Sequence, residues 1–257
     1  MDFGLKNKKK DEEKAAAAVT RLAADDDVQV PAEFQKYAGQ GLEGMTKDDL
    51  KMPRLALAQG LSPQLNPDDP LYIDGLKLGD AYNSLTGEVY GRGPWEVAVV
   101  RRDVPRWVEF VPREEGGGIK DLNVPRNDSR CEWRTIDGVR LPPIATQFYD
   151  YVIVFLASRE VIAASFKSTG IRMTAQPWNS LLKLRGVSKP MFMGKYALRS
   201  VMTKNPKGSF ASLQVVNAGW VSELETLQFL AATFEAFREK EIVIDREPGA
   251  DDDDIDV

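Results

Sequence analysis

Apolar and polar residues alternate through the middle of the chain, with the period of two that is typical of strands with one buried face. The clearest pair is Y-D-Y-V-I-V-F-L-A (149–157) and V-I-A-A-S-F-K-S (161–168), which are joined by a short polar turn. Two such runs around a tight turn predict an antiparallel hairpin. Further strands are expected at 95–102, 106–112, 131–136, 195–203 and 209–217.

Two stretches carry helical patterns instead. The segment P-W-N-S-L-L-K-L-R (177–185) starts with proline and is followed by Gly186, which is the usual asymmetry of helix ends. The segment 221–240 begins with Ser222 and Glu225 in the spacing of a capping box. One face of it is apolar, so we expect a terminal helix there. The apolar positions are Leu227, Leu230, Phe234 and Phe237.

The element order is strands, a long hairpin, a short helix, a second hairpin and a terminal helix. This order predicts a mainly β, α+β fold, an OB-like small β-barrel with an inserted short helix and a C-terminal helix. Any small Greek-key barrel with one inserted helix has the same order. The expected domains are a flexible charged leader (1–30), a single OB-like nucleic-acid-binding domain (31–240) and a disordered acidic tail (241–257).

The composition is that of an ordinary globular protein, with 43% hydrophobic and 28% charged residues in 257. No apolar run is long enough to span a bilayer, and the N-terminal M-D-F-G-L-K-N-K-K-K has no hydrophobic signal region. We therefore expect a cytoplasmic protein with no membrane partner.

The sequence contains no histidine and one cysteine, Cys131. This removes Ser-His-Asp and Cys-His nucleophiles, histidine-ligated zinc, cysteine clusters and intrachain disulfides. We predict no catalytic centre, no metal and no cofactor. A metal-dependent nuclease built on Asp150, Glu160 and Lys167 stays as an alternative, although such nucleases carry an acid where Ser165 stands here.

Charge is unevenly distributed along the chain. The net charge is −5, but no Asp or Glu occurs from Val161 to Ser222, where nine Lys or Arg residues lie. A surface that excludes carboxylates favours a polyanionic ligand. The alternative is that this stretch is mostly core with a few solubilising cations.

Aromatic residues are interleaved with the basic ones, as in proteins that bind single strands by base stacking. Any one strand aromatic is more often a core residue than a platform. Tyr149 and Tyr151 share one strand face because their spacing is two. The candidate nucleic-acid-binding residues are Arg106, Trp107, Trp133, Tyr149, Tyr151, Lys167, Arg172, Trp178, Lys183, Arg185, Lys195, Tyr196, Arg199, Lys204 and Lys207.

The chain ends in D-D-D-D-I-D-V, a segment that cannot form a core and whose charges repel one another. It is either a solubilising tail or a peptide that binds partner proteins or the basic groove of its own chain. The candidate tail residues are Asp251, Asp252, Asp253, Asp254, Ile255, Asp256 and Val257.

The sequence resembles phage and bacterial single-stranded DNA-binding proteins. The resemblance lies in the basic, aromatic-bearing middle, in the acidic end, and in the stretches D-L-K-M-P-R-L-A-L-A-Q-G-L-S-P-Q (49–64), Y-N-S-L-T-G-E (82–88) and W-N-S-L-L (178–182). It implies an OB-fold core and a tail that recruits replication and recombination proteins and competes with DNA. The ending differs from the Pro-Phe of the best-known bacterial members.

We therefore expect a non-enzymatic, sequence-independent single-stranded DNA-binding protein of phage replication or recombination, located in the host cytoplasm. A homo-oligomeric form stays open. Two other classes stay open. One is a virion structural or scaffolding protein whose basic surface binds another protein. The other is the nuclease or recombination enzyme described above.

Overall fold

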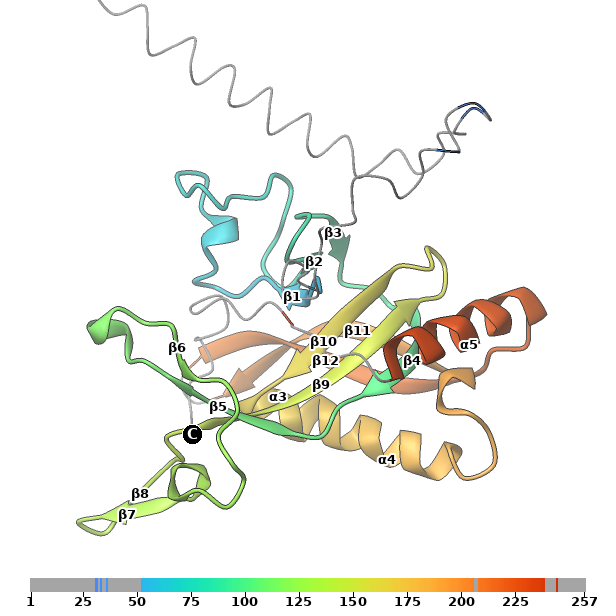
Figure 1. Cartoon of the computed structure of the whole chain (residues 1–257). Coiled ribbons are helices and arrows are strands. Elements are labelled where there is room, and N and C mark those ends of the chain that lie inside the picture. Colours follow the sequence, from blue (N-terminus) through green and yellow to red (C-terminus); the bar gives the residue numbers. More distant parts are fainter. Residues whose placement is uncertain are drawn as a thin grey trace, which may run out of the picture.

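A twisted antiparallel sheet forms the centre of the molecule (Figure 1). The computed structural model describes residues 52–205 and 208–238, together with the single residues 31, 33, 36 and 244. Five strands run side by side in the order β10, β9, β4, β11, β12. Their bounds are β4 (Trp95–Arg102), β9 (Thr146–Phe155), β10 (Val161–Phe166), β11 (Gly194–Asn205) and β12 (Gly208–Trp220).

Strand β9 changes partners along its length. Its second half pairs with β4, where Tyr151 lies opposite Arg102. Its first half pairs with β5 (Arg106–Phe110), where Gln147 lies opposite Trp107. The sheet therefore extends beyond the core on this side, and β5 continues into β6 (Ile119–Asp121).

A helix covers each face of the sheet. On one face, β9, β10 and β11 bury side chains against a helical segment made of α3 (Ser168–Gly170), a π-helical turn (Ile171–Ala175) and α4 (Gln176–Arg185). On the other face, Ala98, Val100, Val152 and Val154 pack against α5 (Leu224–Arg238). Alternate residues of each strand thus serve two separate cores.

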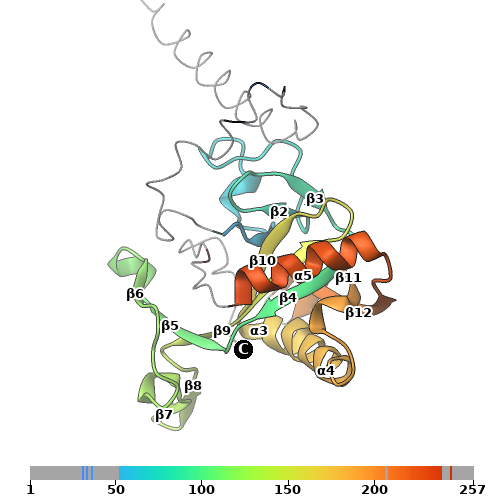
Figure 2. The same ribbon diagram turned by 45° about the vertical axis from the view of Figure 1, so that its right-hand side comes forward.

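A small N-terminal sheet lies beside β10 (Figures 1 and 2). It consists of β1 (Leu55–Leu57), β2 (Ala81–Asn83) and β3 (Val89–Gly91). The amide of Gln59 exchanges two hydrogen bonds of 2.9 Å with the backbone of Ala211 on β12. The N-terminal segment therefore connects the two edge strands of the central sheet.

Two arms stand away from the sheet on the β5 side in both views (Figures 1 and 2). One is β5–β6, and the other is the hairpin of β7 (Arg134–Ile136) and β8 (Val139–Leu141). Short 3-10 helices occur at Pro63–Leu65, Arg113–Glu115, Ser129–Cys131 and Met191–Met193.

An ion network ties the arms together. Arg130 donates to Glu109 of β5 at 2.6 Å, to Asp121 of β6 at 3.1 Å and to Asp128 at 2.8 Å. Lys120 adds a second contact to Glu109 at 2.6 Å. Hydrogen bonds from Lys120 and Arg130 lower the pKa of the buried Glu109 carboxyl. A hydrogen bond from the Arg130 side chain holds the pKa of Asp128 at about 2.

The mainly β, α+β prediction is confirmed, but the OB-like barrel is not: the described strands form no closed barrel. Both predicted hairpins are present as β9–β10 and β11–β12, and both predicted helices as α4 and α5. The expected strand at 131–136 is shorter, because a 3-10 turn occupies Ser129–Cys131. None of the helices described is long and apolar enough to cross a membrane.

One residue of the predicted tail (241–257) lies within the described part of the chain. Ile244 is buried, pairs with Met52 in a parallel bridge and joins the core under α5. An aliphatic side chain that finds an apolar site gains by leaving water, even when its sequence neighbours are charged. Residues 1–30 and 251–257 lie outside the described residues.

Candidate nucleic-acid interface

A pocket of about 300 Å³ lies where β5, β9, the β7–β8 arm and the start of the helical segment meet. We call it the tryptophan pocket. Its lining includes Trp107, Trp133, Thr146, Gln147, Thr169 and Arg172. Its volume is at the lower end of the range typical of ligand sites.

The strand period places Trp107 in this pocket. Trp107 lies opposite Gln147 on β9, on the same sheet face as Tyr149 and Tyr151. Because this is the face that α4 covers further along the sheet, the ring lies close to the beginning of the helical segment. Its half-buried position fixes the ring while leaving part of it accessible.

The helical segment brings Arg172 to the same place. The segment begins earlier than the predicted 177, with α3 and a π-helical turn ahead of α4. Arg172 is exposed on that turn. Two residues later, the buried Thr174 hydroxyl donates a hydrogen bond to the backbone oxygen of Leu213 on β12. Extra turns of this kind are often found at functional sites.

Trp133 reaches the pocket from the β7–β8 arm. Its ring is 52% exposed, and the guanidinium carbon of Arg140 lies 4.5 Å from the ring centroid. The turn between the strands contains Asp137 and Gly138, both with positive φ. Because Thr135 pairs with Arg140, Trp133 and Arg140 share one face of the hairpin. The Asp-Gly turn in the sequence was a signal that could have placed Arg140 beside Trp133.

The pocket is electrostatically suited to an anion. No carboxylate is among its lining residues, while Arg172 and Arg140 are exposed at or beside it. Arg102 lies near the same face, 5.8 Å from the centroid of the Tyr149 ring and 2.8 Å from Asn179 of α4. Arg102 was not among the predicted residues, because nothing in its local sequence marks the pairing of β4 with β9.

Three of the predicted stacking residues are core residues instead. Tyr151, Trp178 and Tyr196 are at most 1% exposed, and the rings of Tyr151 and Trp178 stack at 5.1 Å. Burial raises the pKa of both tyrosines. Burial of a large ring removes more apolar area from water than burial of a small side chain, and this favours the interior position of these three residues. Tyr149 is half-buried against the same core.

Arg106 points away from the tryptophan pocket. It lies next to Trp107 in sequence and therefore faces the opposite side of the sheet, where it pairs with the buried Asp150 at 3.3 Å. Asp150 also accepts a hydrogen bond of 2.5 Å from Ser165. Arg106 thus acts as a partner for a buried charge in this structure.

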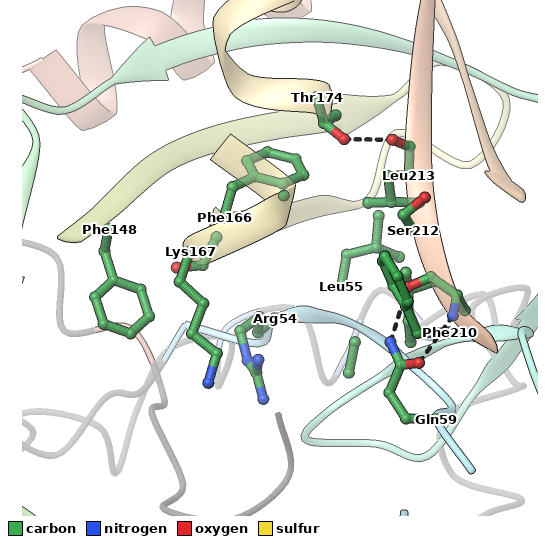
Figure 3. A pocket seen from close by; sticks show the side chains of 15 residues that line it. Arg54, Leu55, Gln59, Phe148, Phe166, Lys167, Thr174, Phe210, Ser212 and Leu213 are labelled. Carbon is green, nitrogen blue, oxygen red and sulfur yellow. Dashed lines mark hydrogen bonds between the residues drawn. The ribbon is translucent and has the colours of Figure 1, made fainter. Parts of the chain in front are cut away.

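Lys167 lies in a different pocket. With Arg54 it lines a hollow between β1, β10 and β12, and Figure 3 shows both side chains extending in the same direction. Phe148, Phe166 and Phe210 form apolar walls there. The structure therefore separates Lys167 from Arg172, although they are only five residues apart in the sequence.

Another group of predicted residues gathers at the C-terminal end of α4. Lys183 is exposed, and Arg185 lies 3.9 Å from the centroid of the Trp220 ring. Lys195 forms an ion pair of 3.0 Å with Glu96. Trp220 was not among the predicted residues, because the final tryptophan of a strand carries no local sign of the cation that covers it.

The remaining basic candidates belong to the β11–β12 hairpin. Arg199 is exposed and donates to Gln214 at 2.6 and 2.8 Å, and Lys204 is exposed further along β11. This hairpin forms the sheet edge away from β5. Lys207 and the tail residues Asp251 to Val257 lie outside the described residues.

The acidic residues proposed for a nuclease do not meet. Asp150 pairs with Ser165 near one end of the β9–β10 hairpin, whereas Glu160 lies at the turn at the other end. Glu160 accepts hydrogen bonds from Tyr90 at 2.6 Å and Asn83 at 2.8 Å. Within residues 52–205 and 208–238, no group of three or more acidic or cysteine side chains is placed to hold a metal ion.

A family model described as Pam3 phage gp34-like protein matches residues 23–243, which is more than half of the chain. No curated protein and no solved structure matches the chain.

Proposed function

The chain belongs to the Pam3 phage gp34-like protein family, and from this premise we propose that it is a phage protein that binds single-stranded DNA without sequence preference. The observation that carries the proposal is the tryptophan pocket: two tryptophans and an exposed arginine line one hollow that contains no carboxylate. Binding of single strands needs both of these chemistries in one place.

Each lining residue has a role in this proposal. Trp107 and Trp133 offer ring surface to one or two bases, and each stacked base contributes about 1–3 kcal/mol. Arg172 and Arg140 attract the phosphates, whose contacts position the strand without reading its sequence. Duplex DNA hides its bases from such rings, so the site favours single strands.

The acidic tail has a role at the same surface. D-D-D-D-I-D-V carries five carboxylates and can compete with phosphates for the arginines of the pocket. The same peptide can recruit replication or recombination proteins. Both roles depend on charge, so both weaken as salt increases.

The test is fluorescence anisotropy of a labelled 30-nucleotide single strand and of the matching duplex, titrated across a salt series. We expect salt-sensitive binding to the single strand, weaker binding to the duplex and quenching of tryptophan fluorescence. Equal binding of both, or no binding, would show the proposal to be wrong. A labelled RNA of the same sequence determines whether the sugar matters.

The variants for this test come directly from the pocket. Arg172→Gln should weaken binding and reduce the salt slope by about one, because one phosphate contact is lost. Lys77→Gln is the matched control. Lys77 is exposed in the N-terminal segment, and its replacement removes the same charge away from the pocket. An equal effect of both changes would mean that only net charge matters.

A virion structural role is the second candidate, and the arms favour it. Ile136 and Val139 on the β7–β8 hairpin are 50% and 60% exposed, and Ile119 and Leu122 lie exposed on or next to β6. Exposed apolar side chains on projecting arms are typical of protein–protein contacts. This role predicts self-association or partner binding that Val139→Asp abolishes and that single-stranded DNA does not affect. Sedimentation of the wild type and of Val139→Asp, with and without single-stranded DNA, measures it.

A further inference from the structure

A second cationic and aromatic surface lies at the other end of the helical segment. We call it the Trp220 cluster, and it consists of Lys183, Arg185, Lys189 and Trp220. The Trp220 ring is 37% exposed, with the Arg185 guanidinium carbon 3.9 Å and the Lys189 ammonium 4.5 Å from its centroid. The accessible ring and its cations match the tryptophan pocket, whereas the absence of carboxylates does not, because Trp220 also lines a hollow with Glu88, Glu96, Glu160 and Glu223.

The cluster has one fixed and one exchangeable cation. Arg185 donates to the backbone oxygens of Lys195 and Gly219 and to the side chain of Asn217, which fixes its position against the ring. Lys189 is exposed, and its ammonium lies over the face of the Trp220 ring. A base can therefore take the place of Lys189 on the ring, and the freed ammonium can contact a phosphate.

The helical segment joins the two surfaces. Arg172 and Arg185 are thirteen residues apart on one helical run, which is roughly 20 Å at 1.5 Å per residue. The whole run from Ser168 to Arg185 contains no acidic residue. Its outer side exposes Gln176, Ser180 and Lys183, so nothing on the helix itself repels a phosphate backbone between the two ends.

We propose that one single strand contacts both surfaces, running along α4 from the tryptophan pocket to the Trp220 cluster. This inference rests on the proposed function and extends it to a strand length. A span of 20 Å corresponds to roughly six nucleotides at the 3.4 Å spacing of a stacked strand, and to fewer in an extended one. Strands shorter than the span reach one surface only.

The experiment compares labelled oligothymidylates of 3 and 15 nucleotides with the full chain. Trp220→Ala should weaken binding of the 15-mer by roughly fivefold to a hundredfold, the loss of one stacked base, and should weaken the 3-mer much less, because a 3-mer can still occupy the tryptophan pocket alone. Val187→Ala, at an 85% exposed position two residues from Lys189, is the control and should change neither. Thermal melting of Trp220→Ala checks that the variant is folded.

A second variant keeps the test valid if Trp220→Ala does not fold. Lys189→Gln leaves the ring in place and should lower the salt slope of the 15-mer by about one, whereas Lys77→Gln should not. If wild type binds both lengths and these variants match it, the two-surface path is wrong while the proposed function stands. Equal loss for both lengths also contradicts the path. No binding of wild type to either strand overturns both.

Discussion

A tryptophan can serve as a base platform only where solvent reaches its ring, and the five tryptophans of this chain differ in this respect. Trp178 is fully buried between Tyr151 and Tyr196, whereas Trp133 is half exposed on an arm. Both have a basic residue nearby in the sequence, so the sequence did not separate them. Whether a ring is core or surface depends on which elements pack over it.

Alanine substitutions separate the two kinds of tryptophan. Trp178→Ala should lower the free energy of unfolding by about 3–5 kcal/mol, because it leaves a large cavity in the core. Trp133→Ala should change it by less than about 0.5 kcal/mol, because the ring is exposed. Urea unfolding measures both values. In the DNA-binding assay the order reverses, and a folded Trp133→Ala should bind single strands more weakly.

At the scale of elements, the arms depend on charge and the sheet depends on apolar burial. The Arg130 network links β5, β6 and the loop before β7 through three carboxylates, whereas β9 and β10 are held by two apolar cores. The position of Trp133 at the pocket therefore rests on ion pairs. Ion pairs respond to pH, whereas the burial of apolar side chains does not.

Acid should release the arms before it unfolds the sheet. The pKa of Asp128 is about 2 in the folded chain against an ordinary value of 3.8, and the pKa of Glu109 is also lowered. A carboxyl group whose pKa is depressed by folding stabilises the fold at pH values above its ordinary pKa. It loses this contribution as the pH falls toward its pKa in the folded chain. The protection of residues 119–136 against hydrogen exchange, relative to the intrinsic rate at each pH, should therefore fall between about pH 4 and pH 2, ahead of that of β9.

The variant Asp128→Asn provides the control for this pH effect. It removes one titrating group. Protection of the arms against hydrogen exchange should therefore already be lower at pH 7 and should fall less on acidification than in the wild type. Identical pH profiles for wild type and variant would mean that the arms are not held by this network.

Local patterns predicted the elements better than they predicted the site. The hairpins β9–β10 and β11–β12 followed from alternation and turn residues, and α5 followed from its apolar face. The tryptophan pocket joins Trp107, Trp133 and Arg172, whose contacts depend on the partner change of β9, the ion network of the arms and the π-helical turn. None of these three is visible in a window of neighbouring residues.

At the scale of the whole molecule, the acidic C-terminal end and the basic middle of the chain should attract each other. Removing residues 249–257 takes away five carboxylates and should tighten binding to single strands, most at low salt where charge is least screened. Titration of the truncated chain at 20 and 200 mM salt measures the difference. Unchanged or weaker binding at low salt would show that the tail does not compete for the pocket.

The point of truncation matters for this comparison. Removing residues 241–257 also removes Ile244, which is buried against the core under α5, and should cost about 1.5–3 kcal/mol of stability. The shorter truncation leaves Ile244 in place. Melting temperatures of the two chains should therefore differ, with the 249–257 deletion close to wild type.

The bridge between Met52 and Ile244 brings the start of the continuously described chain into contact with the last described residue. A domain whose ends meet can be cut elsewhere and rejoined there, which makes it suitable for circular permutation. The exposed Asp137–Gly138 turn at the tip of the β7–β8 arm is the natural place for new ends, because both residues are exposed and the strands beside them are short. A linker from residue 244 to residue 52 would join the original ends, and the new ends would lie at the tip of the arm that carries Trp133. A dye attached to one of these new ends can report when a single strand binds.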